Sequence, residues 1–290
     1  MAMILDGHIH LTDGDPAPDA LLTDLAAAGV GGGVLISQRP ACFDRTSPRP
    51  AQPPAVRLQH VLDWCAAGMN LYPLFWIDPL EPDALDQVAL AVSRGIAGFK
   101  VICAHFPPGH PDALRTFRAI ADAGRPILFH SGILWDGQPS SQFNRPAGFE
   151  ALLDVPGLRF ALAHISWPWC DELIAVYGKF LNALGRSRAA PVEMFVDITP
   201  GTPPIYRQRA LTDLFTVGYD VADHVIFGSD CHAPGYNTWW AKEWLQRDAE
   251  ILTGLDLGQD ALDKVQGENL RRFLGLTDQR AERAIPRPGA

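Results

Sequence analysis

The sequence lacks the features on which membrane-spanning, exported and disulfide-stabilised proteins depend. It contains no apolar run approaching the ~18 residues of a transmembrane helix, so we expect no membrane partner. The first residues, MAMILD, lack the basic segment and long apolar stretch of an export signal. The five cysteines are an odd number without CxxC spacing, which predicts free thiols, each most often a small buried apolar group. Together these absences predict a cytoplasmic protein.

Positive charge is also scarce. The chain has 24 Lys and Arg residues against 33 Asp and Glu residues, for a net charge of −9, and contains no run of basic residues. Nucleic-acid-binding surfaces usually cluster Lys and Arg, so we expect no nucleic-acid partner. A small-molecule substrate is the expected partner, and the sequence leaves a homo-oligomer open.

Short apolar runs rich in Val, Ile and Phe alternate with segments of helical periodicity. This pattern predicts buried parallel strands joined by crossover helices. Eight such units predict an α/β fold, a (β/α)₈ TIM barrel over residues 1–276, with an extra C-terminal helix at 259–274 and a polar tail at 277–290. The predicted strands are 4–10, 32–37, 70–77, 96–102, 126–131, 159–165, 193–199 and 224–230. The predicted helices are 19–28, 57–67, 83–94, 111–123, 147–154, 170–185, 206–217 and 239–253.

An open doubly wound sheet is the alternative topology. It would place a glycine-rich phosphate turn after the first strand, where this chain has HIHLTDGD. Two long Pro-rich loops, 38–55 and 104–111, follow strands two and four. Both belong at the carboxyl end of the barrel, so they are candidate lids or pocket walls, although plain surface loops are an equal reading of the first.

Polar residues end several of these strands. His8 and His10 are two apart in the first strand, so both side chains point to one face. His130, His164 and Asp230 end strands five, six and eight. Parallel strands of a barrel end at one opening, and burying so many polar groups there is costly without a partner. The pattern predicts a metal site.

With these strand-end residues the chain resembles the amidohydrolase superfamily, in particular the branch that includes aminocarboxymuconate-semialdehyde decarboxylase and amidohydrolase-related hydrolases. The similar segments span nearly the whole chain: DGHIH at 6–10, GFKV at 98–101, FHSG at 129–132, LAHIS at 162–166, FGSD at 227–230 and GENLRRFLG at 267–275.

The resemblance implies a role for each residue at the strand ends. His8, His10, His130 and Asp230 match the ligands of one divalent ion, most commonly Zn²⁺, which leaves room for a water molecule. Asp230 matches the proton shuttle, and His164 matches the histidine that polarises the substrate carbonyl or orients the water.

Lys100 leaves the metal count open. In members with two ions, a carboxylated lysine at this place bridges them, and His130 and His164 then bind the second ion. In the branch that this chain resembles, one ion is commoner and such a lysine is free to contact substrate. We therefore expect one ion and list Lys100 among the catalytic residues, with a simple ion pair as its alternative role.

Residues beyond the strand ends suggest a substrate pocket. We expect Trp76, Trp135 and Trp167 to bind substrate, with core packing as the alternative for each aromatic. Further aromatic, histidine and arginine candidates are Phe106, Trp169, Trp239, Trp240, His105, His110, His232, Arg39, Arg45 and Arg49. The predicted reaction is hydrolysis of an amide, ester or lactone in a small, ring-containing substrate. The alternative is non-oxidative decarboxylation of an aromatic or enoic acid, which an arginine directed at the metal would favour. A barrel that only binds a ligand is the third reading.

Overall fold

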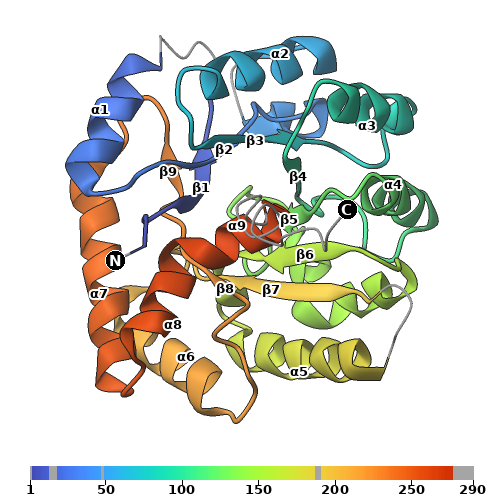
Figure 1. Ribbon diagram of the computed structural model, residues 1–290. Helices are drawn as coiled ribbons and strands as arrows, with labels where there is room; N and C mark the ends of the chain where they lie inside the picture. The colour runs from blue at the N-terminus through green and yellow to red at the C-terminus, as the bar shows by residue number, and fades with distance from the viewer. Residues whose placement is uncertain (1, 13–17, 47–48, 187–190, 277–290) are drawn as a thin grey trace, which may run out of the picture.

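The fold is a parallel sheet surrounded by helices (Figure 1). The computed structural model describes residues 2–12, 18–46, 49–186 and 191–276. Within this part of the chain the sheet has nine strands in the order β8-β7-β6-β5-β4-β3-β2-β1-β9. The strands are β1 (Asp6–His10), β2 (Gly33–Ile36), β3 (Leu71–Trp76), β4 (Gly98–Val101), β5 (Ile127–Phe129), β6 (Arg159–Leu162), β7 (Glu193–Asp197), β8 (Val225–Ile226) and β9 (Cys231–His232). The expected TIM-barrel fold is confirmed; the tail at 277–290 lies outside the described residues.

The eighth strand of the barrel is split into two short pieces. β8 pairs with β7, whereas β9 pairs with β1. Between them, Phe227 O accepts from Gly7 N at 2.9 Å, and Asp230 N donates to His8 O at 3.0 Å. The chain from 225 to 232 therefore joins the two ends of the sheet. The predicted strand 224–230 is in reality this interrupted segment, and the interruption lets Asp230 leave the strand conformation.

Helices cover the outer face of the sheet. They are α1 (Asp19–Ala28), α2 (Pro54–Cys65), α3 (Ala84–Ser93), α4 (Pro111–Asp122), α5 (Cys170–Arg186), α6 (Pro204–Thr216) and α7 (Thr238–Gly254). The predicted helix 147–154 is a 3₁₀ helix, η3 (Pro146–Asp154), preceded by another, η2 (Ser141–Asn144). Its buried residues Phe149 and Leu152 are three apart, a spacing that suits both helix types. The spacing of apolar residues therefore could not distinguish an α-helix from a 3₁₀ helix here.

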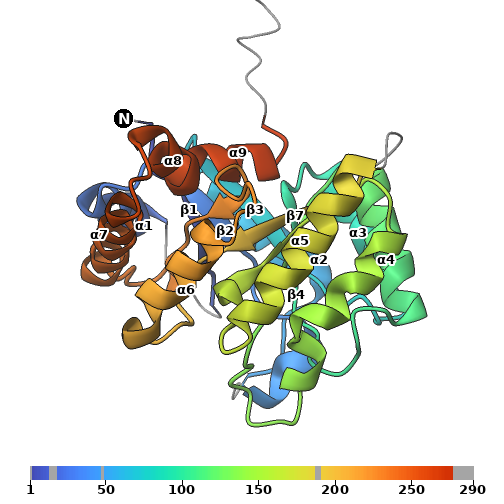
Figure 2. The same ribbon diagram turned by 90° about the horizontal axis from the view of Figure 1, so that it is seen from below.

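The C-terminal helix predicted at 259–274 is broken in the middle. It consists of α8 (Gln259–Asp263), a π turn η5 (Lys264–Glu268) and α9 (Asn269–Phe273), which lie together at one end of the barrel (Figure 2). The turn frees two carbonyl groups: Gln266 O accepts from Leu5 N at 2.7 Å, and Val265 O accepts from Phe227 N at 3.0 Å. The break thus fastens this segment to the start of β1 and the end of β8.

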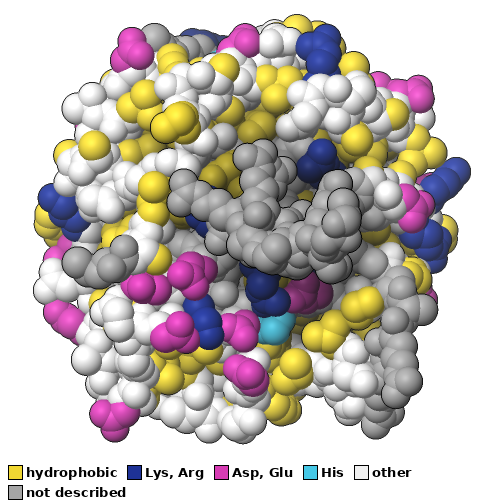
Figure 3. All heavy atoms as spheres, viewed as in Figure 1, with side chains coloured by type: hydrophobic (Ala, Val, Ile, Leu, Met, Phe, Trp, Pro, Cys, Tyr) yellow, Lys and Arg dark blue, Asp and Glu magenta, His cyan; other side chains and the backbone are white. Residues whose placement is uncertain are grey.

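Apolar side chains fill this end of the barrel. Leu5, Leu270 and Phe273 are buried together, with the other members of the cluster coming mainly from β2, β3, β5, β6 and β7. The predicted site residues lie at the opposite end, where the strands finish. On the face seen in Figure 3, basic side chains lie beside acidic ones. Lys264 of η5 pairs with Asp223 at 3.0 Å. Among the described residues, no helix is long and apolar enough to cross a membrane.

Candidate active site

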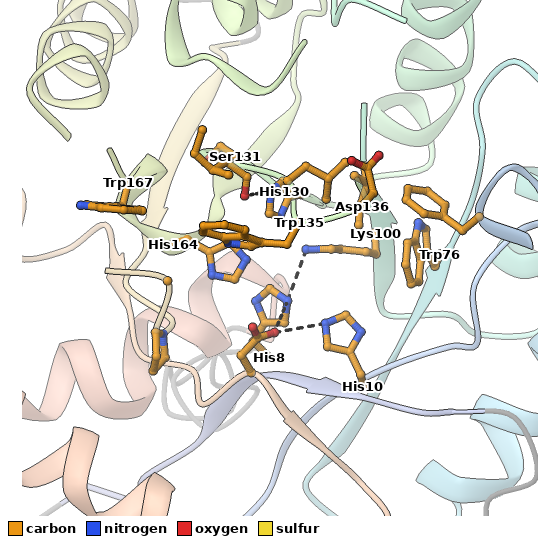
Figure 4. A pocket seen from close by; sticks show the side chains of 17 residues that line it. His8, His10, Trp76, Lys100, His130, Ser131, Trp135, Asp136, His164 and Trp167 are labelled. Atoms are coloured by element: carbon orange, nitrogen blue, oxygen red, sulfur yellow. Dashed lines mark hydrogen bonds and ion pairs between the residues drawn. The ribbon is translucent and has the colours of Figure 1, made fainter. Parts of the chain in front are cut away.

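A cavity of about 350 Å³ opens at the carboxyl ends of the strands. The predicted site residues from β1, β4, β5, β6 and the 227–230 segment all line it (Figure 4). Among the described residues its lining consists of His8, His10, Phe43, Trp76, Lys100, Ile102, His130, Ser131, Ile133, Leu134, Trp135, Asp136, His164, Trp167, Pro200, Gly201 and Asp230. The barrel topology therefore brings together residues that are up to 222 positions apart in the chain, as His8 and Asp230 are.

His8 is held by a buried carboxylate. Its Nδ1 lies 2.8 Å from Oδ2 of Asp197, at the end of β7. An imidazole that donates its Nδ1–H to a carboxylate presents the lone pair of Nε2 on the other side. His8 Nε2 lies 3.6 Å from Asp230 Oδ1 and 3.3 Å from Lys100 Nζ. His8 therefore faces the cavity in the orientation that a metal ligand needs.

Asp230 reaches the cavity from a left-handed backbone. Its φ is 59°, a conformation that non-glycine residues rarely adopt, and its side chain is 37% exposed. Oδ1 lies 3.3 Å from His10 Nε2. Burial opposes ionisation, but the hydrogen bond from His10 outweighs it and holds the pKa of this carboxyl well below its usual range. Asp230 is therefore an ionised carboxylate that faces open space.

His164 begins a segment of unusual backbone. His164, Ile165 and Ser166 have φ values of 62°, 44° and 54°. Three consecutive non-glycine residues in this region store strain, which is typical of functional sites. Ser166 Oγ is held 2.7 Å from Ser131 Oγ, which in turn donates to Ala163 O at 2.6 Å. The strain thus turns the His164 side chain from the strand end into the cavity.

Three potential ligand atoms gather closely in this cavity. One atom each of His8, His164 and Asp230 lies within 4.8 Å of the others. The buried Nδ1 of His164 has no hydrogen-bond partner. Burial lowers the pKa of His8, His10, His130 and His164, which favours the neutral form of the imidazole that a metal ion binds. This donor set fits a divalent ion of the zinc type.

His130 and His10 lie next to this group. The ring centroids of His130 and His164 are 4.9 Å apart, and His130 Nε2 lies 3.2 Å from Ile133 O. The rings of His8 and His10 are 5.0 Å apart. One nitrogen of His130 is thus engaged by the backbone, whereas the hydrogen bond of His10 goes to Asp230 itself.

Lys100 is a buried cation in the cavity. It is 1% exposed, and burial lowers the pKa of its amine to about 8, although Asp197 and Asp230 oppose this shift. Lys100 is the single lysine, and there is no arginine, among the described residues that line the cavity. Its amine thus balances the carboxylates at the base of the site.

Aromatic side chains form the upper wall. Trp76, Trp135 and Trp167 line the cavity, and Trp135 is 81% exposed. The loop after β2 contributes Phe43, whose ring lies 5.0 Å from that of Trp76. Among the described lining residues, the predicted alternatives Phe106, Trp169, Trp239, Trp240, His105, His110, His232, Arg39 and Arg49 are absent, and the Arg45 side chain lies outside the described residues. Of the two readings of loop 38–55, pocket wall and plain surface loop, the first therefore holds at Phe43.

A comparison with models of protein families shows to which family this chain belongs. A model of the family described as amidohydrolase matches residues 6–276, almost the whole length. The chain belongs to the amidohydrolase family. No curated protein matches it significantly.

Solved structures show the same fold in amidohydrolases and related enzymes. A 2,6-dihydroxybenzoate decarboxylase from Rhizobium has a TM-score of 0.65 at 16% identity, with 95% of this chain and 99% of that chain covered. A Burkholderia multivorans amidohydrolase with bound zinc has a TM-score of 0.65 at 13% identity, with coverages of 94% and 99%. A Campylobacter jejuni dihydroorotase has a TM-score of 0.59 at 18% identity, with coverages of 96% and 84%. At these identities the likeness concerns the fold.

Sequence reasoning did not single out two residues that hold this amidohydrolase site. Asp197 lay within a predicted strand, and its place at the strand end was the available signal. Asp6 is fully buried: Oδ1 accepts from His8 N at 3.0 Å and from Ser229 N at 2.9 Å, and Oδ2 accepts from Tyr236 Oη at 2.8 Å. It ties β1 to the residue before Asp230. Its signal was an acidic residue inside an apolar strand.

Proposed function

We propose that the protein is a metal-dependent hydrolase that cleaves an amide, ester or lactone bond in a small, ring-containing molecule. The observation that carries this proposal is the Asp230 carboxylate. It is ionised and exposed to the cavity, and it lies within 3.6 Å of the His8 and His10 imidazoles. A carboxylate in that place can serve both a metal ion and the proton of an attacking water.

His8, His10 and Asp230 would hold one divalent ion, with a further imidazole completing the set. The sequence favoured His130 for that role. The contacts favour His164 instead, because its Nδ1 is unpartnered and it belongs to the close group with His8 and Asp230. A bound zinc-like ion would supply a water with a pKa near ~7, and hence a nucleophile at neutral pH.

Proton transfer would fall to Asp230. Its Oδ atoms would accept the proton of the attacking water and return it to the leaving group. Before an ion binds, the hydrogen bond from His10 Nε2 keeps this carboxylate ionised. With His10 as a ligand, the charge of the ion would do so instead. Lys100 Nζ, 3.3 Å from His8 Nε2, would stabilise negative charge on the substrate oxygen or hold a substrate carboxylate.

The cavity walls favour a flat, partly apolar substrate. Trp76 and Phe43 form one wall, and Trp135 and Trp167 line the cavity with them. Aromatic walls bury the faces of ring-shaped ligands well. The cavity of about 350 Å³ suits a small molecule and not a polymer chain.

Decarboxylation of an aromatic or enoic acid at the same site is the second candidate. The buried Lys100 amine favours it, because this cation would hold a carboxylate next to the ion. A decarboxylase was expected to direct an arginine at the metal. The described residues that line the cavity include no arginine. We therefore rank hydrolysis first.

The test is a paired assay on the zinc-loaded protein with panels of cyclic amides, esters and lactones and of aromatic acids. We expect ring opening or ester cleavage with no release of carbon dioxide. Asp230→Asn should keep the fold, measured by circular dichroism, and lose at least about 100-fold in kcat. Full activity of Asp230→Asn would refute the proposed mechanism, and carbon dioxide release by the wild type would establish the second candidate.

A further inference from the structure

A second group of metal-ligand side chains lies outside the catalytic cavity. Cys42, Asp78 and His105 each offer one atom, and these atoms lie within 4.8 Å of one another. Cys42 lies in the 3₁₀ helix η1 (Ala41–Thr46), Asp78 follows β3, and His105 follows β4. Three separate segments thus converge on one point, and none of these three residues lines the catalytic cavity.

Cys42 and His105 both contact the carboxylate of Asp78. Oδ2 of Asp78 lies 3.0 Å from His105 Nε2. Asp78 is 6% exposed, and within the described residues its one ion pair is with His105. Oδ1 accepts from Leu80 N at 3.0 Å. A buried carboxylate is costly unless it is paired, and here the partners are an exposed imidazole and a thiol.

The thiol of Cys42 is not arranged as a nucleophile. Burial and the Asp78 carboxylate, which also hydrogen-bonds to it, raise the pKa of Cys42, so the reactive thiolate is disfavoured. His105 directs Nε2 at the Asp78 carboxylate. A divalent cation would reverse this preference, because coordination removes the thiol proton.

We propose that Cys42, Asp78 and His105 form a second metal site that takes a zinc-type ion. One thiolate, one imidazole and one carboxylate are the ligand types that Zn²⁺ uses in proteins, and they leave a fourth position for water. Ligand atoms around a tetrahedral zinc ion are about 3.5 Å apart, so atoms already within 4.8 Å need only small movements to enclose it. Magnesium and calcium prefer all-oxygen sites and would be poor occupants.

The site would fix a wall of the catalytic cavity. Cys42 is followed by Phe43, whose ring packs on Trp76 at 5.0 Å, and the Trp76 ring lies 6.0 Å from that of His10. An ion bound by Cys42, Asp78 and His105 would fasten η1 to the ends of β3 and β4. None of these three ligands is among the described residues that line the catalytic cavity, so the proposed site does not depend on the proposed reaction.

Cobalt(II) distinguishes this site from the catalytic one. Among the described residues that line the catalytic cavity there is no cysteine, so cobalt bound there gives no thiolate charge-transfer absorption. The full-length metal-free protein is titrated with Co²⁺ and then with Zn²⁺. We expect a thiolate-to-cobalt band in the near ultraviolet that Zn²⁺ abolishes. Absence of this band from the folded wild type would overturn the proposal.

Two variants and a matched control complete the test. Cys42→Ser should lose the band and one equivalent of zinc by elemental analysis, whether the catalytic cavity holds one ion or two. His105→Ala changes a side chain that is 45% exposed, so it should fold and bind Co²⁺ at least 10-fold more weakly. Cys170→Ser, at a half-buried cysteine remote from the three ligands in sequence, should behave as wild type. Equal zinc content in the wild type and Cys42→Ser would refute the site.

Hydrogen exchange supplies a readout of the role in the cavity wall. Zinc should slow amide exchange across residues 41–46 in the wild type and in Cys170→Ser, and have no such effect in Cys42→Ser. Slowing of equal size in Cys42→Ser would place the ion elsewhere and contradict the proposal.

Discussion

The Nδ1 atom of His8 lies 2.8 Å from the Oδ2 atom of Asp197, and both side chains are almost fully buried. The pair spans 189 positions of sequence. Through it, β7 sets which nitrogen of a β1 histidine faces the cavity. Carboxylates that hold a ligand histidine in this way commonly tune metal affinity.

Asp197→Asn should weaken zinc binding. The amide can direct its NH₂ group at His8 Nδ1 and favour the wrong tautomer, so we expect an affinity loss of about 10- to 100-fold. Competition with a chromophoric chelator measures this change. Asp122→Asn, at an exposed carboxylate that ends α4, is the control. Unchanged affinity in Asp197→Asn would show that the pair has no part in metal binding.

His164 and His130 should differ in their effect on the metal. His164→Ala removes a member of the close ligand group, to which His130 does not belong, so we expect it to lower zinc affinity at least about 10-fold more than His130→Ala does. Equilibrium dialysis with elemental analysis provides the measurement. His232→Ala, whose ring lies 6.1 Å from His10, controls for the loss of a nearby imidazole. The reverse order would restore the ligand set that the sequence favoured, with His130 as ligand.

Gly228→Ala should disturb His8 directly. A Cβ atom there would lie 2.2 Å from Thr199 Oγ1 and 2.8 Å from the Cβ of His8. Overpacking of this kind typically costs about 1–3 kcal/mol, and here it also displaces a proposed ligand. Urea unfolding and zinc content together test the prediction. Gly254→Ala, which has nothing within 4 Å, should match the wild type. If Gly228→Ala were as stable as the wild type, the chain around residue 228 would have to move aside without loss of unfolding free energy, contrary to this prediction.

Glu193 should make a pH-dependent contribution to stability. It lies 2.7 Å from Arg272 Nη1 and 3.2 Å from His224 Nε2, and so joins the start of β7 to α9. Burial raises the pKa of this carboxyl, but these two partners outweigh burial and lower it. A lowered pKa stabilises the fold above the ordinary value of about 4.3, and this contribution disappears as the pH falls through the folded-state value.

Glu193→Gln should therefore be less stable than wild type at pH 7 by about 1 kcal/mol, a modest figure because the Arg272 side chain is 40% exposed. The difference should vanish in strongly acidic solution. Urea unfolding across this range measures both values. Glu243→Gln, which breaks an exposed pair with Arg247, should show little change at either pH. A difference that persists unchanged in acid would exclude ionisation of Glu193 as its cause.

Local sequence patterns determined most of the barrel. Short runs of Val, Ile and Phe favour buried parallel strands, and the intervening periodicity of three to four residues buries one face of each helix. Gly29, Gly95 and Gly124, which follow helices, take left-handed φ values of 78°, 83° and 68°, a conformation that glycine adopts readily. Where two structures share one pattern, as in η3, the sequence could not choose between them.

The sequence by itself also determined where the polar site lies. His8, His10, His130, His164 and Asp230 follow apolar runs, and parallel strands in a barrel must end at one opening. Lys100 belongs to the same strand ends, within β4. These positions follow from strand direction alone.

Only the tertiary structure decided how these residues contact one another. The left-handed turns at His164 and Asp230, the Asp197 partner of His8, and the convergence of Cys42, Asp78 and His105 are features of the folded chain alone. Contacts between distant residues depend on register, twist and loop path, which no local pattern encodes. The spacing of His8 and His10 thus predicts a metal site from the sequence, whereas the tertiary structure determines which of their ring nitrogens face the cavity.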